Sequence, residues 1–274
     1  MKSYLSLVPI SAKVRKRQNR MTILCVIISI FLVTAIFSVA DMMIRTQSDR
    51  MTGKNGSWHI ELDGISQETA LKIAERDDVV SIGAVTIFNP DGELPYRMDG
   101  KRVVLYGIDE SYLTMNSTGA AEGRFPQGMG EIMLSSNAAR VLQVAVGDTV
   151  TLRTPSGDWD FTVSGLGGVE ESYYSGQYSL MDAYLPRTAF AALMEQNNVH
   201  NLQTSYYVQF TSASKAAKAI PELTAQHNLP ENAVSENTGV MAIAGQSDSS
   251  AAKNVYSLAA VLFVLVLLAG VLMI

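Results

Sequence analysis

The sequence has 274 residues, of which 47% are hydrophobic and 17% are charged, and its formal net charge at pH 7 is −5. This acidic balance argues against a nucleic-acid-binding protein, which presents a basic face to the phosphate backbone. The single cysteine, Cys25, excludes an internal disulfide and a cysteine-based zinc site.

The hydrophobic residues are concentrated in two blocks without charge, residues 21–40 and 255–274. A helix rises 1.5 Å per residue, so about 20 residues cross a hydrocarbon core of about 30 Å. The sequence therefore predicts a membrane protein with transmembrane helices at residues 21–44 and 253–274. These helices flank a central domain at residues 45–252.

The charges around the first block predict its orientation. Residues 1–20 contain basic residues and no acidic residue, whereas the acidic residues begin at Asp41. The positive-inside rule then places residues 1–20 in the cytoplasm and the central domain outside. A signal peptide cleaved after Ala40 is the alternative, because Ser38 and Ala40 have the spacing that a signal peptidase recognises.

In chain order, the first half of the central domain predicts a helix, a strand, a helix and two strands. The first helix continues the span to about Met51, and Ser66 is the expected N-cap of the second. The alternation of apolar and polar residues predicts the strands. The predicted ranges after the first helix are strand 58–62, helix 67–75, strand 79–88 and strand 102–108.

The second half predicts further short strands and helices. Ser136 or Asn137 is expected to cap a short helix, and Pro221 is expected to bend or break the last long helix. The predicted ranges are strand 131–134, helix 137–142, strands 149–153 and 159–164, a glycine-rich loop, strand 178–185, helix 186–195, strand 205–211 and helix 214–226. This order predicts an α+β extracytoplasmic domain with a small β-rich lobe at about residues 102–166.

One loop is a candidate contact surface for a substrate or partner. Acidic and aromatic side chains gather there, and such a surface can grip a peptide or a cationic amphiphile. A partly packed loop is the alternative. The residues are Glu170, Glu171, Tyr173, Tyr174 and Tyr178. We predict no catalytic, metal-binding or cofactor-binding residue, because the three histidines are scattered and no nucleophile, base and orienting group can be assembled.

Five short motifs lie in register between residues 122 and 165. They read EGRFP at 122–126, EIMLS at 131–135, AARVL at 138–142, VGDTVTL at 146–152 and FTVSG at 161–165. Their order and spacing resemble the extracytoplasmic core of MacB-like, FtsX-like permeases of ABC transporters. Within them, Gly123, Arg124, Pro126, Gly147 and Asp148 are expected to shape turns and not to form an active site.

The resemblance implies a permease subunit that couples ATP hydrolysis to export, or to mechanical work outside the membrane, on a peptide, lipoprotein or antibiotic-like substrate. It implies a place in the plasma membrane of a bacterium, with contact to the lipid bilayer. It also implies a separate ABC ATPase that binds ATP and Mg²⁺, and a homodimer or pseudo-dimer of permeases. Such permeases have four spans, so the sequence is expected to be truncated at its C-terminus. The alternative is a membrane sensor or scaffold that detects a peptide or regulates a cell-wall hydrolase without transport.

Overall fold

The computed structural model describes residues 16–116, 120–167, 180–230, 232–247, 260, 261 and 264. The chain divides into two compact units, which are treated separately below. One comprises Met1–Asp49 and Ile243–Ile274, and the other comprises Arg50–Ala242.

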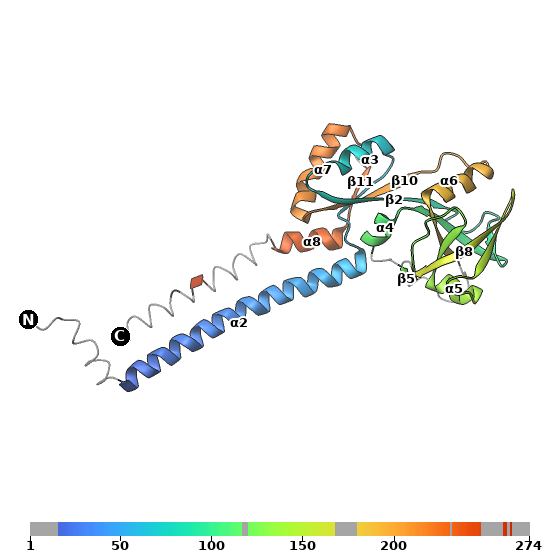
Figure 1. Ribbon diagram of the computed structural model, residues 1–274. Coiled ribbons are helices and arrows are strands. Elements are labelled where there is room, and N and C mark those ends of the chain that lie inside the picture. The colour runs from blue at the N-terminus through green and yellow to red at the C-terminus, as the bar shows by residue number, and fades with distance from the viewer. Residues whose placement is uncertain are drawn as a thin grey trace, which may run out of the picture. The chain divides into compact units, whose positions relative to one another are not determined.

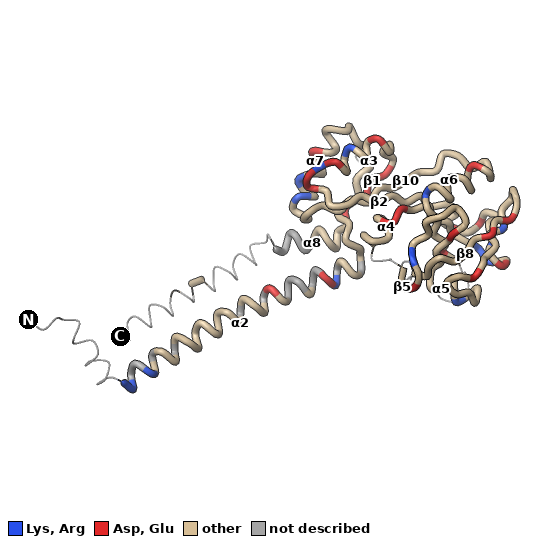
Figure 2. The backbone as a smooth tube through the Cα atoms, in the orientation of Figure 1, with Lys and Arg blue, Asp and Glu red and all other residues tan. Residues whose placement is uncertain are grey.

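The first described element is the 40-residue helix α2, Lys16–Asn55. Figure 2 shows basic residues at its start, and the next charge in the sequence is Asp41. The helix runs past residue 44, as predicted, and Gly56 follows it with a φ of 80°. Within the described residues, no helix meets the combined length and hydropathy that crossing a membrane requires. The predicted second span lies outside the described residues except at 260, 261 and 264.

The first lobe of the Arg50–Ala242 unit is an antiparallel sheet in the order β11–β1–β10–β2, with two helices on one face (Figure 1). Alternate residues of β1 and β10, such as Ile60 and Val208, point into the core beneath α3 and α7. The predicted cap of α3 is confirmed, because the Ser66 hydroxyl accepts a hydrogen bond from the Thr69 amide. The elements are β1 (Ile60–Leu62), α3 (Gln67–Ala74), β2 (Val79–Phe88), β10 (Thr204–Phe210), α7 (Ala213–His227) and β11 (Val234–Glu236).

The second lobe is a small closed barrel with the strand order β4–β3–β7–β8–β6–β9. Its ring closes because β9 pairs with β4 in parallel as well as with β6. The interior is filled by apolar side chains such as Leu105, Leu134 and Phe161. The elements are β3 (Arg97–Met98), β4 (Lys101–Ile108), β5 (Ala120–Gly123), β6 (Glu131–Ser135), α5 (Ser136–Leu142), β7 (Thr149–Thr154), β8 (Gly157–Gly167), β9 (Met181–Pro186) and α6 (Arg187–Gln196).

A short helix, α4 (Glu110–Met115), covers the face of β2 that α3 and α7 leave free. It approaches so closely that a Cβ on Gly83 would lie 2.4 Å from the Tyr112 amide nitrogen. Asp109 caps the helix, and its carboxylate accepts hydrogen bonds from Tyr112 N and Ala84 N. The last described helix of some length is α8 (Thr238–Ser247).

The α+β prediction is confirmed, but several local predictions are wrong. The β-rich lobe extends beyond residues 102–166, because β3 and β9 complete its ring. The expected glycine-rich loop is strand up to Gly167, where β8 pairs with β5 and β6. Ser135 and not Ser136 or Asn137 caps α5. Of the bend or break predicted at Pro221, the break is not found, because α7 continues through that residue. The elements β3, α4, β5 and β11 were not predicted.

Candidate functional site

The acidic and aromatic loop predicted to contact a substrate or partner, Glu170, Glu171, Tyr173, Tyr174 and Tyr178, lies outside the described residues. Its role as a contact surface stays a prediction. The described residues contain three other candidate regions. These are the turns built by the family motifs, a cluster of aromatic and acidic side chains beside α4, and a pocket beside α6.

The first turn, between β5 and β6, is held by an ion pair between Arg124 and Glu131. The Arg124 Nη1 donates to Glu131 Oε2 at 2.9 Å, and Nη2 donates to Oε1. The same carboxylate accepts the amide N–H groups of Gln127, at 2.9 Å, and Gly128, at 3.3 Å. These bonds, chiefly the one from Arg124, lower the pKa of Glu131 to about 2. Pro126 is buried in the same turn.

The second turn lies before β7 and contains Gly147 and Asp148. Gly147 has a φ of 97°, a conformation that side-chain-bearing residues reach only with strain. The Asp148 carboxylate accepts a hydrogen bond of 2.7 Å from the Ala145 amide. The Gly147 amide donates to the Val163 carbonyl at 2.8 Å, so the turn is fastened to β8.

Both turns meet on adjacent residues of β8. The Arg124 amide donates to the Ser164 carbonyl at 2.9 Å, next to the Val163 carbonyl that receives Gly147. Gly123 has a φ of 74°, and a Cβ on it would lie 2.4 Å from the Ser164 oxygen. The motif residues therefore hold the barrel together around β8. Sequence reasoning missed that Arg124 and Glu131, from separate motifs, form one ion pair.

An aromatic and acidic cluster packs where α4 covers the sheet. The Tyr207 ring makes edge contacts with Trp58 and Tyr112, with centroids 4.9 and 5.0 Å apart. Its hydroxyl donates to Glu61 Oε1 at 2.8 Å. Burial raises the pKa of the Glu61 carboxyl. Among the described residues, no buried side-chain nitrogen or oxygen lacks a hydrogen-bond partner, so we interpret this cluster as packing.

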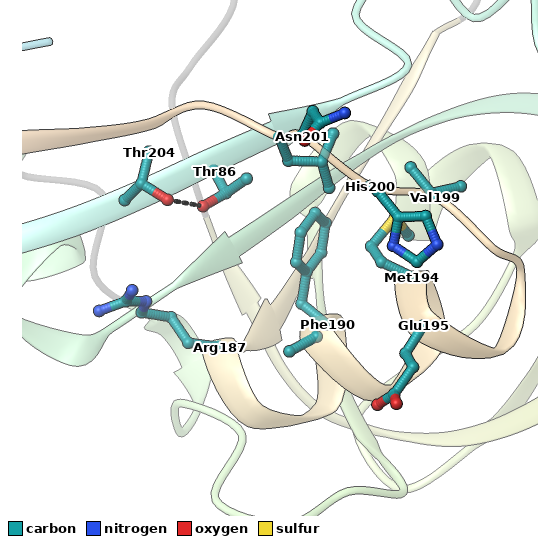
Figure 3. Close-up of a pocket in the computed structure, with 11 residues that line it drawn as sticks. Thr86, Arg187, Phe190, Met194, Glu195, Val199, His200, Asn201 and Thr204 are labelled. Atoms are coloured by element: carbon teal, nitrogen blue, oxygen red, sulfur yellow. Dashed lines mark hydrogen bonds between the residues drawn. The ribbon is translucent and has the colours of Figure 1, made fainter. Parts of the chain in front are cut away.

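A pocket of about 440 Å³ opens beside α6 (Figure 3). Its apolar lining includes Phe190 and Met194, which are 4% and 3% exposed. Arg187 lines it from the first turn of α6, and Glu195 lines it two turns later. The size is within the usual range for small-ligand pockets, about 300–1,000 Å³. The volume and the lining residues thus suit a small ligand with apolar and charged parts.

Polar groups at the two ends of the pocket come from different strands and loops. Thr86 of β2 and Thr204 of β10 share a hydrogen bond of 2.8 Å between their hydroxyls, which Figure 3 shows. His200 is exposed at the pocket and hydrogen-bonds to Asn198. Across the described residues, no group of three or more potential ligands could hold a metal ion. Only tertiary structure brings these side chains together, and no sequence motif marks them.

Comparison with known proteins gives the family. Residues 21–226 match the model of the MacB-like periplasmic core domain, which is most of the chain and includes the whole barrel. The chain belongs to this family. No curated protein matches it.

Two solved structures are similar to this chain, and the first of them supports the MacB-like fold. The periplasmic region of MacB from Actinobacillus actinomycetemcomitans is 14% identical, with a TM-score of 0.50 over 73% of this chain and 97% of that chain. The extracellular domain of the ABC-type transporter YknZ from Gram-positive bacteria is 15% identical, with a TM-score of 0.44 over 65% and 98% of the two chains. The match to the family model confirms, at the level of family, the resemblance found in the five sequence motifs.

In this MacB-like domain, the motif turns lie entirely in the barrel lobe and the α6 pocket lies at its junction with β2 and β10. Membership of the family implies an extracytoplasmic domain of a membrane protein that works with an ABC ATPase.

Proposed function

We propose that this chain is the permease subunit of an ABC transporter complex of the MacB/FtsX type. In the complex, ATP hydrolysis in the cytoplasm drives export, or mechanical work outside the membrane, on a peptide, lipoprotein or antibiotic-like substrate. The observation that carries the proposal is the match of residues 21–226 to the MacB-like periplasmic core domain. The fold shared with the periplasmic region of MacB is consistent with it.

In this proposal, residues 21–44 and 253–274 cross the plasma membrane of a bacterium. Residues 1–20 lie in the cytoplasm and the MacB-like domain lies outside. The uncharged run at 21–40 and the basic residues before it support this orientation. Figure 2 shows basic positions at the start of α2.

The chain itself acts mechanically and not as an enzyme. ATP and Mg²⁺ bind to the partner ATPase, and the permease works as a homodimer or pseudo-dimer in the lipid bilayer. The closed barrel and the doubly fastened β8 support this role, because a stiff domain transmits a displacement without deforming. The predicted loop at Glu170 to Tyr178 and the α6 pocket are the candidate contact sites for a substrate or partner.

Purification of the chain with its native partners tests the proposal. An affinity-tagged chain is extracted from its own membrane in mild detergent, and co-purifying proteins are identified by mass spectrometry. We expect an ABC ATPase in stoichiometric amount and ATPase activity in the purified complex. Membranes with the untagged chain serve as the control.

Co-purification with other proteins and without an ATPase would contradict the proposal. If the chain is recovered with a histidine kinase or a cell-wall hydrolase and without an ATPase, the transport proposal is wrong. The sensor or scaffold function would then stand in its place.

A further inference from the structure

Three arginines form a row across the outer surface of the barrel. Arg97 on β3 lies opposite Arg102 on β4 and opposite Arg153 on β7. The neighbours Met98 and Leu152 are buried in the barrel core, so strand alternation directs the three arginines outward. Like charges directly opposite each other destabilise a sheet. The row therefore works against stability and calls for another explanation.

The chain neutralises this row only weakly. Arg153 Nε lies 3.6 Å from Asp158 Oδ1, but the two side chains are 75% and 53% exposed, where ion pairs contribute little. Within the described residues, Arg102 has no ion pair. Arg97 donates from Nη1 to the main-chain carbonyls of Leu94, at 2.5 Å, and Tyr96, at 2.8 Å, with a longer contact of 3.4 Å to the Gly92 carbonyl. These neutral acceptors fix its position without cancelling its charge.

A cleft of about 380 Å³ opens next to the row, between the β3–β4 hairpin and β7. Arg97 and Arg153 line it, and partly buried apolar side chains of Leu142 and Val144 line it as well. One acidic residue, Asp99, also borders it. The cleft thus combines two guanidinium groups with an apolar wall.

We propose that this cleft binds a small amphiphilic anion. A compact phosphate or carboxylate head lies between Arg97 and Arg153, and a short aliphatic part lies against Leu142 and Val144. Guanidinium groups bind both oxyanions through paired, charge-assisted hydrogen bonds. An anion between the two arginines also removes the repulsion that the empty row carries. This binding site is inferred from the pairing of β3 with β7 and does not depend on the ATPase partner. Either proposal can therefore be wrong while the other holds.

Ligand-observed NMR on the full chain tests the binding site. The chain is held in phosphatidylcholine nanodiscs, and saturation transfer to hexyl phosphate is measured against empty nanodiscs. We expect saturable binding to the parent chain that weakens with added salt. In Arg153→Gln, binding should weaken about tenfold, which corresponds to the loss of one charge-assisted contact. Lys218→Gln on α7 carries the same loss of charge away from the cleft and should bind like the parent.

The chemistry of the ligand is resolved by three further probes and one variant. Hexanoate should compete with hexyl phosphate, whereas hexanol and inorganic phosphate, each lacking one half of the ligand, should bind at least about tenfold more weakly. Val144→Ser should weaken hexyl phosphate and leave inorganic phosphate unchanged. Equal binding of hexanol or of inorganic phosphate to the parent would overturn the amphiphile assignment.

Thermal stability separates a ligand site from a structural one. Because Arg153→Gln removes a like-charge pair, its melting temperature without ligand should equal or exceed that of the parent. Hexyl phosphate should raise the melting temperature of the parent and of Lys218→Gln only. A variant that melts lower without ligand, or that binds hexyl phosphate as the parent does, shows that the row is structural and that the proposal is wrong.

Discussion

At the scale of single residues, the motifs act through backbone conformation and hydrogen bonding. Gly123 and Gly147 both have positive φ, but only Gly123 lacks room for a Cβ. The Glu131 carboxylate accepts hydrogen bonds from two main-chain amides and one guanidinium. The residue type at each position thus depends on the hydrogen bonds that its neighbours donate and on the space that they leave for a side chain.

The depressed pKa of Glu131 predicts a pH dependence. Its folded pKa is about 2, below the ordinary value of 4.5, so its contribution to stability is complete above about pH 4.5. The contribution is lost as the pH falls towards 2. At pH 6, Glu131→Gln should melt about 2–4 °C below the parent, because its side chain is only 25% exposed and charge-assisted bonds are lost.

At pH 2.5, the difference between parent and Glu131→Gln should be much smaller than at pH 6, because the stabilisation is lost progressively as the pH falls from 4.5 towards the folded pKa of about 2. The exposed Glu195, replaced by Gln, is the control and should show no such gap at either pH. A gap that stays constant from pH 6 to pH 2.5 would show that the charge of Glu131 does not hold the turn.

At the scale of elements, helices take their places through close contacts with the sheet. A Cβ on Gly83 would strike the backbone of α4, and a Cβ on Gly107 would lie 2.4 Å from the Phe190 ring of α6. Helix α7 behaves differently, since it keeps Pro221 in its interior. Its apolar side, with Ala216 and Leu223 buried against the first lobe, holds the helix together across the proline.

Replacement of that proline should stabilise the domain. Pro221 lacks the N–H that an interior helical residue donates four residues back, and it is exposed. Pro221→Ala should therefore raise the free energy of unfolding by about 1–3 kcal/mol, measured by chemical denaturation. Pro230→Ala, beyond the end of α7, is the control and should change it little. A loss of stability in Pro221→Ala would mean that the proline fixes a bend that the lobe needs.

At the scale of the whole molecule, the two lobes of the Arg50–Ala242 unit share one eleven-stranded sheet. Strand β4 belongs to both, because it pairs with β2 of the first lobe and with β3 and β9 of the barrel. A displacement of one lobe is therefore transmitted through continuous main-chain hydrogen bonds. This continuity suits the mechanical role proposed for the domain.

The proposed topology predicts which surfaces reagents can reach. Single cysteines are introduced at Ser156, in the exposed β7–β8 turn, and at Ser11, in a chain with Cys25 replaced by Ser. In intact cells, a membrane-impermeant maleimide should label the cysteine at 156 and not the one at 11. Both should react after the cells are permeabilised. Labelling at 11 without labelling at 156 would reverse the orientation.

The sequence alone determined the family and most local elements of this protein. Strand β2 and the Ser66 cap were predicted correctly, because alternation and capping depend on residues only a few positions apart. The five motifs lie within one short stretch, so their spacing was visible without a structure.

Only the tertiary structure decided the closure of the barrel and the pairing of Arg124 with Glu131. It also decided which residues line the α6 pocket and the cleft beside the arginine row. Two-residue β3 is too short to show a pattern, and it exists because β4 and β7 hold it on both sides. The ring closes through β4 and β9, about 80 residues apart, and Arg97 meets Arg153 in the same way. Such contacts depend on which strands become neighbours, and the local sequence periodicity does not specify this.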